Sequence, residues 1–145
     1  MSTDRTESKD PLKSSFNDLL GLRISQWSEG RAVVEIDLDN RHLNRSGVLH
    51  GGVLTTLIDA ACGFAGCYCA LPGRVRKALT LSLTTSFTGQ ARSGTIRAVA
   101  SKRAGGRKIF VATAEVTNDS GDIIGLGEGT YRYRSGSEDE SGVPE

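Results

Sequence analysis

One carboxylate, Asp59, interrupts a long run of small and apolar residues that extends from Asn44 to Leu71. An acid in such surroundings is either buried with a hydrogen-bonding partner or positioned to act on a ligand. Shortly before it, Gly51 and Gly52 open a segment, 52–71, that we predict to be helical. First-turn N–H groups have no partner within a helix and carry the positive end of its dipole. The stretch therefore combines a carboxylate with a candidate oxyanion or carbonyl site.

On a helical wheel, this predicted helix has one side of large apolar residues and one side of small residues around Asp59. The apolar side, predicted to face a sheet, contains Leu54, Leu57, Ile58, Ala61, Phe64, Ala65 and Tyr68, and the small side contains Thr55, Thr56, Cys62, Gly63, Gly66 and Ala70. A solvent-exposed face would normally carry Lys, Glu and Arg, so a second subunit or a ligand is expected on the small side. A membrane span is disfavoured by the central acid.

Gly51 and Asp59 are eight residues apart, which separates them by roughly 12 Å along a helix. Within one helix they cannot contact the same atom. A reaction that used both would need the carboxylate of a second copy of the helix, antiparallel to the first across a dimer interface. The small-residue side permits such an approach.

The remaining elements predict an α+β protein. A short amphipathic helix is indicated near the N-terminus, at 12–20, by apolar residues at helical spacing. Apolar alternation predicts strands at 22–30, 31–39, 77–87, 95–103, 108–116 and 123–134. In the third, Leu79, Leu81 and Leu83 alternate with Thr80, Ser82 and Thr84, and glycines in the last suggest a bulge or close packing. This order predicts a mostly antiparallel sheet wrapped around the long central helix.

Composition excludes several classes of protein. The length of 145 residues fits one domain over residues 1–145. The net charge of +1 argues against nucleic acid as a partner. The polar N-terminus has no apolar segment typical of a secretory signal, and no membrane association is indicated, so a cytoplasmic location is expected.

Two further expectations concern the chain ends and the cysteines. Residues 1–10 and 135–145 are polar and predicted to be disordered, which leaves an ordered core from about 12 to 134. Cys62, Cys67 and Cys69 lie close together, and no second cluster exists to complete a zinc site. We interpret them as reduced core thiols and expect no metal.

The segment from Asn44 to Gly52, Asn-Arg-Ser-Gly-Val-Leu-His-Gly-Gly, followed by Asp59, closely resembles the hotdog-fold acyl-CoA thioesterases of the PaaI-like, phenylacetate-pathway group. The resemblance extends from about residue 16 to about residue 133. It implies a hotdog fold, hydrolysis of an aryl- or medium-chain acyl-CoA, and a homotetramer built as a dimer of dimers. No cofactor is implied, because coenzyme A is part of the substrate.

The resemblance also implies roles for individual residues. Asp59 corresponds to the catalytic carboxylate, as nucleophile or general base, and Gly51 to the residue whose N–H polarises the thioester carbonyl of a substrate bound between two subunits. His50 and Asn44 correspond to side chains that hold the site, and Thr80 to a hydroxyl that orients water or the acid. For substrate binding we predict Gly52 at the helix start, Phe64 and Tyr68 at the acyl group, and Arg103, Arg107 and Lys108 at the phosphates, with Arg74 and Arg76 as a second option.

Two alternatives remain open from the sequence. A non-catalytic acyl-CoA binding or sensing protein would keep the pocket without turnover. A hotdog dehydratase or hydratase is less favoured, because neither His42 nor His50 has a suitable spacing from an acid.

Overall fold

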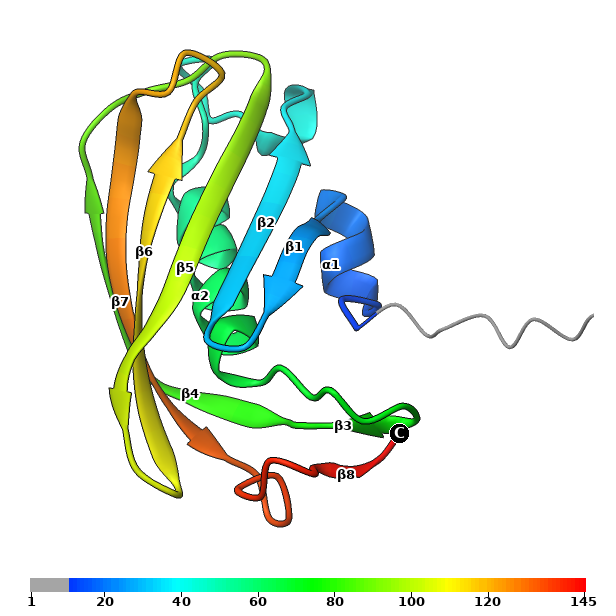
Figure 1. Ribbon diagram of the computed structural model, residues 1–145. Helices are drawn as coiled ribbons and strands as arrows, with labels where there is room; N and C mark the ends of the chain where they lie inside the picture. The colour runs from blue at the N-terminus through cyan, green and yellow to red at the C-terminus, as the bar shows by residue number, and fades with distance from the viewer. Residues whose placement is uncertain (1–10) are drawn as a thin grey trace, which may run out of the picture.

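The computed structural model describes residues 11–145, in which a six-stranded antiparallel sheet curls around one long helix, α2 (Gly51–Gly66) (Figure 1). The strand order is β1-β2-β5-β6-β7-β4. The strands are β1 (Arg23–Ser28), β2 (Arg31–Asp37), β4 (Ala78–Phe87), β5 (Thr95–Gly105), β6 (Ile109–Thr117) and β7 (Ile123–Tyr133). Smaller elements are α1 (Ser15–Leu20), the 3-10 helix η1 (Asn40–His42), and a two-stranded sheet of β3 (Arg74–Val75) and β8 (Val143–Pro144). The predicted α+β hotdog architecture is confirmed.

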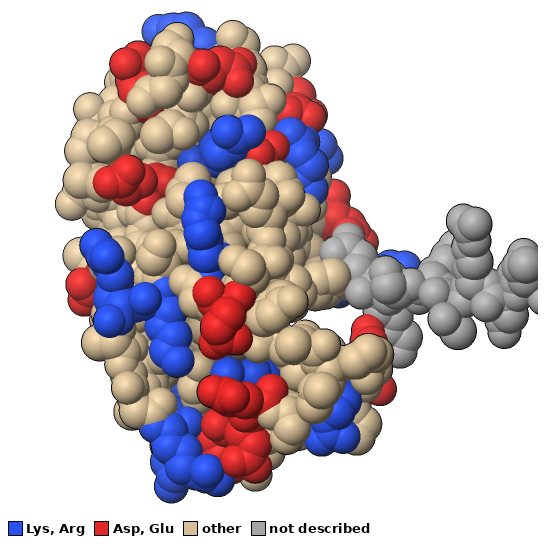
Figure 2. Space-filling model, viewed as in Figure 1, with Lys and Arg blue, Asp and Glu red and all other residues tan. Residues whose placement is uncertain are grey.

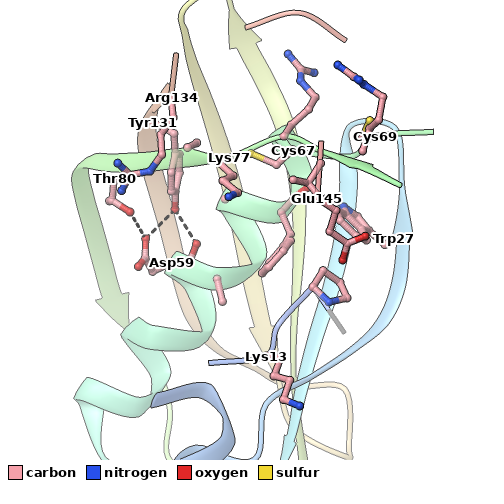
Figure 3. A pocket seen from close by; sticks show the side chains of 18 residues that line it. Lys13, Trp27, Asp59, Cys67, Cys69, Lys77, Thr80, Tyr131, Arg134 and Glu145 are labelled. Atoms are coloured by element: carbon pink, nitrogen blue, oxygen red, sulfur yellow. Dashed lines mark hydrogen bonds between the residues drawn. The ribbon is translucent and has the colours of Figure 1, made fainter. Parts of the chain in front are cut away.

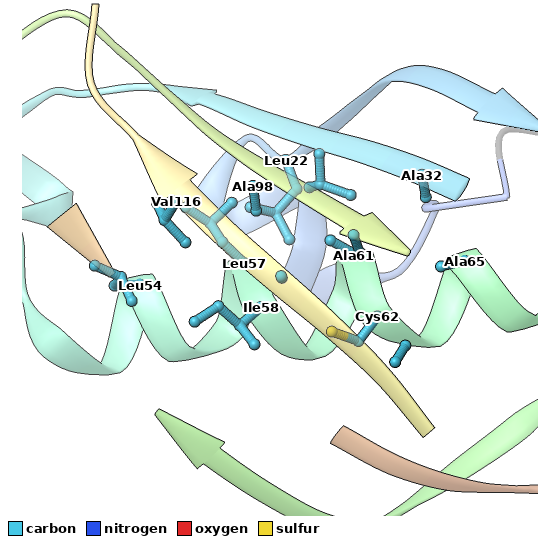
Figure 4. Close-up of a cluster of buried hydrophobic side chains, with 14 of the residues drawn as sticks. Leu22, Ala32, Leu54, Leu57, Ile58, Ala61, Cys62, Ala65, Ala98 and Val116 are labelled. Carbon is cyan, nitrogen blue, oxygen red and sulfur yellow. The ribbon is translucent and has the colours of Figure 1, made fainter. Parts of the chain in front are cut away.

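Helix α2 packs closely on the sheet because strand β7 has glycines where the helix crosses it. A Cβ atom on Gly125 would lie 2.7 Å from Leu54 Cδ2, and one on Gly127 would lie 2.6 Å from Ile58 Cγ2. Figure 4 shows Leu54, Leu57 and Ile58 of this interface within the buried apolar cluster. The close packing suggested by the glycine pattern is therefore present.

Helix α2 ends at Gly66, so the predicted extension to Leu71 is wrong. Side chains from the sheet bind carbonyls of its last turn: Trp27 Nε1 donates to Phe64 O at 2.8 Å, and Tyr133 Oη donates to Gly66 O at 2.5 Å. The predicted division of the helix into an apolar side and a small-residue side is also wrong near its C-terminal end. Cys62 and Gly66 are buried, and the ring of Phe110 lies against Gly66.

Strand β4 is irregular near its start. The register with β7 shifts between Thr80 and Ser82, so the regular alternation of leucine and hydroxyl residues does not define two faces. Thr80 pairs with the buried Tyr131, whereas Leu81, at the shift, is exposed. The irregularity brings a hydroxyl to the helix-facing side of an edge strand.

The C-terminal residues 135–145 are ordered against the core, so the prediction of disorder is wrong for this segment. Arg74 Nε donates to Ser141 O at 2.6 Å, and Arg76 Nε donates to Ser137 O at 2.9 Å. Strand β8 then pairs with β3. The polar composition of this segment led to the wrong prediction because its hydrogen-bonding partners lie more than sixty residues upstream. Residues 1–10 lie outside the described part of the chain.

Cations and anions are interspersed over the face of the molecule seen in Figure 2. No helix within residues 11–145 has the length and apolar character needed to cross a membrane.

We predict that Gly66→Ala destabilises the protein by about 1–3 kcal/mol, because overpacking a rigid core has this cost. The new Cβ would lie 2.2 Å from the ring of Phe110, which is fully buried. Gly63→Ala is the matched control, since its Cβ would meet Tyr131 at 3.4 Å. The control should be neutral or stabilising by up to about 1 kcal/mol through helix propensity. Urea unfolding measures the free energy of unfolding of both variants. Equal values would contradict the close packing of Phe110 against Gly66.

Candidate active site

Asp59 lies in the middle of α2, and two hydroxyl groups from the sheet hold one of its carboxylate oxygens. Thr80 Oγ1 donates to Asp59 Oδ1 at 2.7 Å. Tyr131 Oη lies 3.2 Å from the same oxygen and 2.9 Å from Asp59 O, so its single proton is shared between them (Figure 3). No donor within residues 11–145 contacts Oδ2. The carboxylate is thus oriented, with one oxygen left for a ligand or water.

Tyr131 is a site residue that the sequence reasoning missed. Its ring is buried and stacks on Phe110, with the centroids 5.0 Å apart. Burial first, and then the neighbouring Cys62 and Asp59, raise the pKa of Tyr131 above its usual range. The phenol therefore stays protonated and remains a donor. Alternation from Gly129 through Tyr131 to Tyr133 was the available signal that this ring faces the helix.

The start of α2 leaves one amide available. His50 is the N-cap, and its Nδ1 accepts from the Gly52 N–H at 2.9 Å. The Gly51 N–H has no acceptor within residues 11–145. Of the two predicted glycines, only Gly51 can offer its N–H to a ligand, while His50 caps the helix.

Asn44 does not line the cleft next to Asp59. Its Oδ1 accepts from the N–H groups of Ser46 at 2.9 Å and Val48 at 3.3 Å, which closes the turn before α2. In this chain Asn44 shapes the segment that leads to His50.

Asp59 opens onto a cleft of about 720 Å³. The residues that line it, apart from Asp59, Thr80 and Tyr131, are Pro11, Lys13, Trp27, Ala60, Gly63, Phe64, Cys67, Cys69, Arg74, Val75, Arg76, Lys77, Ala78, Arg134 and Glu145. Phe64, which we predicted at the acyl group, is one of these residues. Tyr68 is not among the lining residues; its ring packs edge-on against Trp27, with the ring centroids 5.6 Å apart. The lining thus combines apolar side chains with charged ones, Asp59 among them.

The predicted basic cluster, Arg103, Arg107 and Lys108, is not part of this cleft. Arg103 Nε donates to Thr113 Oγ1 at 3.0 Å, and Arg107 pairs with Asp139 at 3.1 Å. The β5–β6 turn directs these residues elsewhere. Among the basic predictions only the second option, Arg74 and Arg76, reaches the cleft.

No group of three or more His, Cys, Asp or Glu residues in the described part of the chain is arranged to hold a metal ion. The site that the geometry offers consists of one carboxylate, its two hydroxyl donors and the cleft. Such a site suits hydrolysis of a reactive acyl group.

Comparison with known proteins gives the family. The thioesterase superfamily model matches residues 46–124, which include the start of α2 and Asp59. A proposed esterase of Archaeoglobus fulgidus is 30% identical over 118 residues, 81% of this chain and 73% of the relative. The chain belongs to the thioesterase superfamily, and this membership supports a hydrolase.

Solved structures agree with this assignment. A thioesterase of Haemophilus influenzae has a TM-score of 0.75 and 25% identity, covering 84% of each chain. A mutant of the phenylacetic acid degradation protein PaaI of Thermus thermophilus has a TM-score of 0.71 and 26% identity, covering 82% of this chain and 98% of the other. A conserved protein of Pseudomonas aeruginosa has a TM-score of 0.77 and 27% identity, covering 88% and 99%. The resemblance to PaaI-like thioesterases is confirmed at the level of family and fold.

We predict that native Cys62 and Cys67 resist alkylation, although Cys67 lines the cleft. Burial raises the pKa of each thiol to about 12, so about one thiol in ten thousand is ionised at about pH 8. Mass spectrometry after iodoacetamide treatment should show at most one label, on the less buried Cys69, and three after unfolding. Rapid native labelling of Cys67 would instead identify a reactive thiol in the cleft.

Proposed function

We propose that this protein hydrolyses an aryl- or medium-chain acyl-CoA to the free acid and coenzyme A. The observation that carries the proposal is the Asp59 carboxylate, which lines the cleft and which Thr80 and Tyr131 orient through Oδ1, leaving Oδ2 without a donor in the described chain. A thioester has a good leaving group, so a carboxylate and an aimed N–H donor suffice without a serine nucleophile.

Two reaction routes for the hydrolysis account for every bond and proton. With Asp59 as general base, the carboxylate takes a proton from water, and the oxygen of that water adds to the thioester carbonyl carbon. The resulting oxyanion accepts a hydrogen bond from the Gly51 N–H; the C–S bond then breaks, and the proton passes to the thiolate. With Asp59 as nucleophile, Oδ2 forms a mixed anhydride as coenzyme A leaves, and water then releases the acid. Coenzyme A enters only as part of the substrate, and neither route uses a metal.

The Gly51 donor is proposed to come from a second copy of the chain, because the helix separates Gly51 and Asp59 by roughly 12 Å. Strand β4 is at the edge of the sheet, and Leu81 and Phe87 on it are 49% and 58% exposed. An unpaired apolar edge is a natural place for a second chain to pair. We propose a dimer joined at this edge, and a tetramer of two such dimers.

A similar structure and the lining of the cleft support an aryl or medium-chain acyl group. One similar structure is named as a phenylacetic acid degradation protein, and the aromatic rings of Trp27 and Phe64 line the cleft of this chain. An aryl group fits such walls, as does an alkyl chain of moderate length.

We expect Asp59→Asn to lower kcat for acyl-CoA hydrolysis by about 10²–10⁴ with little change in stability, because the amide oxygen can still accept from Thr80 and Tyr131. Release of free thiol from aryl and alkyl acyl-CoAs measures the rate. Glu128→Gln is the matched control, since Glu128 is an exposed acid on β7 outside the cleft. An unchanged rate in Asp59→Asn would exclude the mechanism. Tight binding of acyl-CoA by the wild type without any turnover would favour the acyl-CoA sensor.

We also expect Gly51→Pro to lower kcat by about 10²–10³, the usual cost of losing an oxyanion donor. Gly51 is the first helical residue, where proline is favoured, so the change removes the N–H and adds a ring whose Cβ would lie 3.2 Å from the exposed side chain of Phe87. His50 before it has φ −65° and ψ 132°, a conformation that proline accepts. An equal melting temperature would show that the helix start is intact. A rate equal to that of the wild type would remove Gly51 from the mechanism.

Mixing the two inactive variants tests the shared site. In a mixed dimer, the Gly51→Pro chain supplies Asp59 and the Asp59→Asn chain supplies Gly51, which restores one of two sites. Random reassociation should therefore recover about a quarter of the wild-type activity. If both residues acted within one chain, no activity would return.

A further inference from the structure

His42 is a buried histidine that the proposed mechanism does not use. It is the last residue of η1, drawn in cyan after β2 in Figure 1, and its side chain is 0% exposed. It is not among the residues that line the cleft next to Asp59. Because burying a polar ring is unfavourable without compensating hydrogen bonds, its two nitrogens are expected to have partners within the protein.

Both ring nitrogens of His42 contact backbone groups. Nδ1 accepts from the Asp39 N–H at 3.0 Å, and Nε2 lies 2.7 Å from Leu20 O. A carbonyl only accepts and an amide N–H only donates, so the ring proton is on Nε2 and Nδ1 carries none. Asp39 Oδ1, 3.5 Å from Nδ1, accepts instead from the Arg41 N–H at 3.0 Å. The neutral ring therefore joins the end of α1 to the start of η1, and neither nitrogen is free to act on a substrate.

The backbone of the same residue holds the start of α2. His42 O accepts from the His50 N–H at 2.8 Å. On the other side of the Gly51 N–H, His50 Nδ1 accepts from the Gly52 N–H at 2.9 Å. The peptide group that carries the Gly51 N–H thus lies between two fixed contacts, and these contacts set its direction.

We propose that His42 is a positioning residue, which fixes its own backbone between α1 and η1, holds His50, and thereby directs the Gly51 N–H at the substrate carbonyl. The inference rests on the Gly51 donor of the thioesterase mechanism proposed above. An oxyanion donor is effective when it is aimed at the place where charge develops. A displacement of about 1 Å in such a group can lower a rate about 10²-fold.

The first test compares His42→Leu with His42→Gln. Leucine offers no hydrogen bond, whereas the glutamine amide has a donor for Leu20 O and an acceptor for the Asp39 N–H, and glutamine is common at this position of a capping box. His42→Leu should lower kcat for acyl-CoA hydrolysis about 10–10²-fold with little change in KM. His42→Gln should retain kcat within about threefold of the wild type. The inference is wrong if His42→Leu keeps the wild-type kcat, or if both variants lose it equally.

Val116→Ala is the control for lost stability. Val116 is fully buried on β6 and belongs to the apolar core rather than to the cleft. At a temperature where all variants are folded, it should keep the wild-type kcat. If His42→Leu does not fold, His42→Asn replaces it, because its shorter side chain reaches only the position of Nδ1 and loses the contact with Leu20 O. An unchanged kcat in a folded His42→Asn variant would contradict the inference.

A double variant shows whether His42 acts through Gly51. Gly51→Pro already lacks the N–H, so adding His42→Leu or His42→Asn should lower kcat by no more than about twofold further. If the two losses instead multiply in full, His42 acts at another place and the inference fails.

Amide hydrogen exchange tests the inference without turnover. The His50 N–H should exchange about 10-fold faster or more in His42→Leu and at the wild-type rate in His42→Gln, while the amides of the central strand β6 keep their rates. If this result is found and the wild type hydrolyses no acyl-CoA, the positioning by His42 stands and only the proposed function fails. An unchanged exchange rate of the His50 N–H in His42→Leu would overturn the inference whatever the activity.

Discussion

The rise of an α-helix holds Gly51 and Asp59 roughly 12 Å apart, and the rest of the site is arranged around this fixed separation. One strand, β4, lies beside both residues: Thr80 near its start donates to Asp59, and the ring of Phe87 at its end lies against Gly51. That strand is also an edge of the sheet. The free edge and the two separated parts of the site thus belong to the same element, which is why we propose that a second copy completes the site there.

The position of Asp59 depends on packing that begins in the core. Gly66 allows the ring of Phe110 to lie against the end of α2, and Phe110 stacks on Tyr131, whose hydroxyl contacts Asp59. Tyr133 also packs on Phe110 and binds the last turn of the helix through Gly66 O. Aromatic rings have few rotamers and fill the interface without voids. The carboxylate is therefore oriented by rigid groups on the sheet rather than by its own helix.

The sequence predicted what depends on local periodicity. Alternation gave the strands, the run of small and apolar residues from Gly52 gave the helix, and the His50-Gly-Gly motif followed by Asp59 gave the family resemblance. The prediction failed where contacts between residues far apart in the sequence determine the structure. Tyr133 binds the end of α2 at Gly66, far along the chain, and Arg74 orders the polar C-terminal segment through Ser141 O. Tyr131 was missed for the same reason: alternation indicates that its ring faces the helix, but its contact with Asp59 depends on how the sheet curls around that helix.

The basic residues near the cleft divide into two groups by what they bind. Arg74 and Arg76 donate to carbonyls of residues 137–142, a use that suits the several fixed donors of a guanidinium. Carbonyl oxygens satisfy those donors without cancelling the positive charge. Lys77 and Arg134, beside them, have no such partners in the described chain. The folded C-terminal segment therefore uses the guanidinium groups of Arg74 and Arg76 without forming an ion pair with them, while it also brings the carboxylate of Glu145 to the cleft.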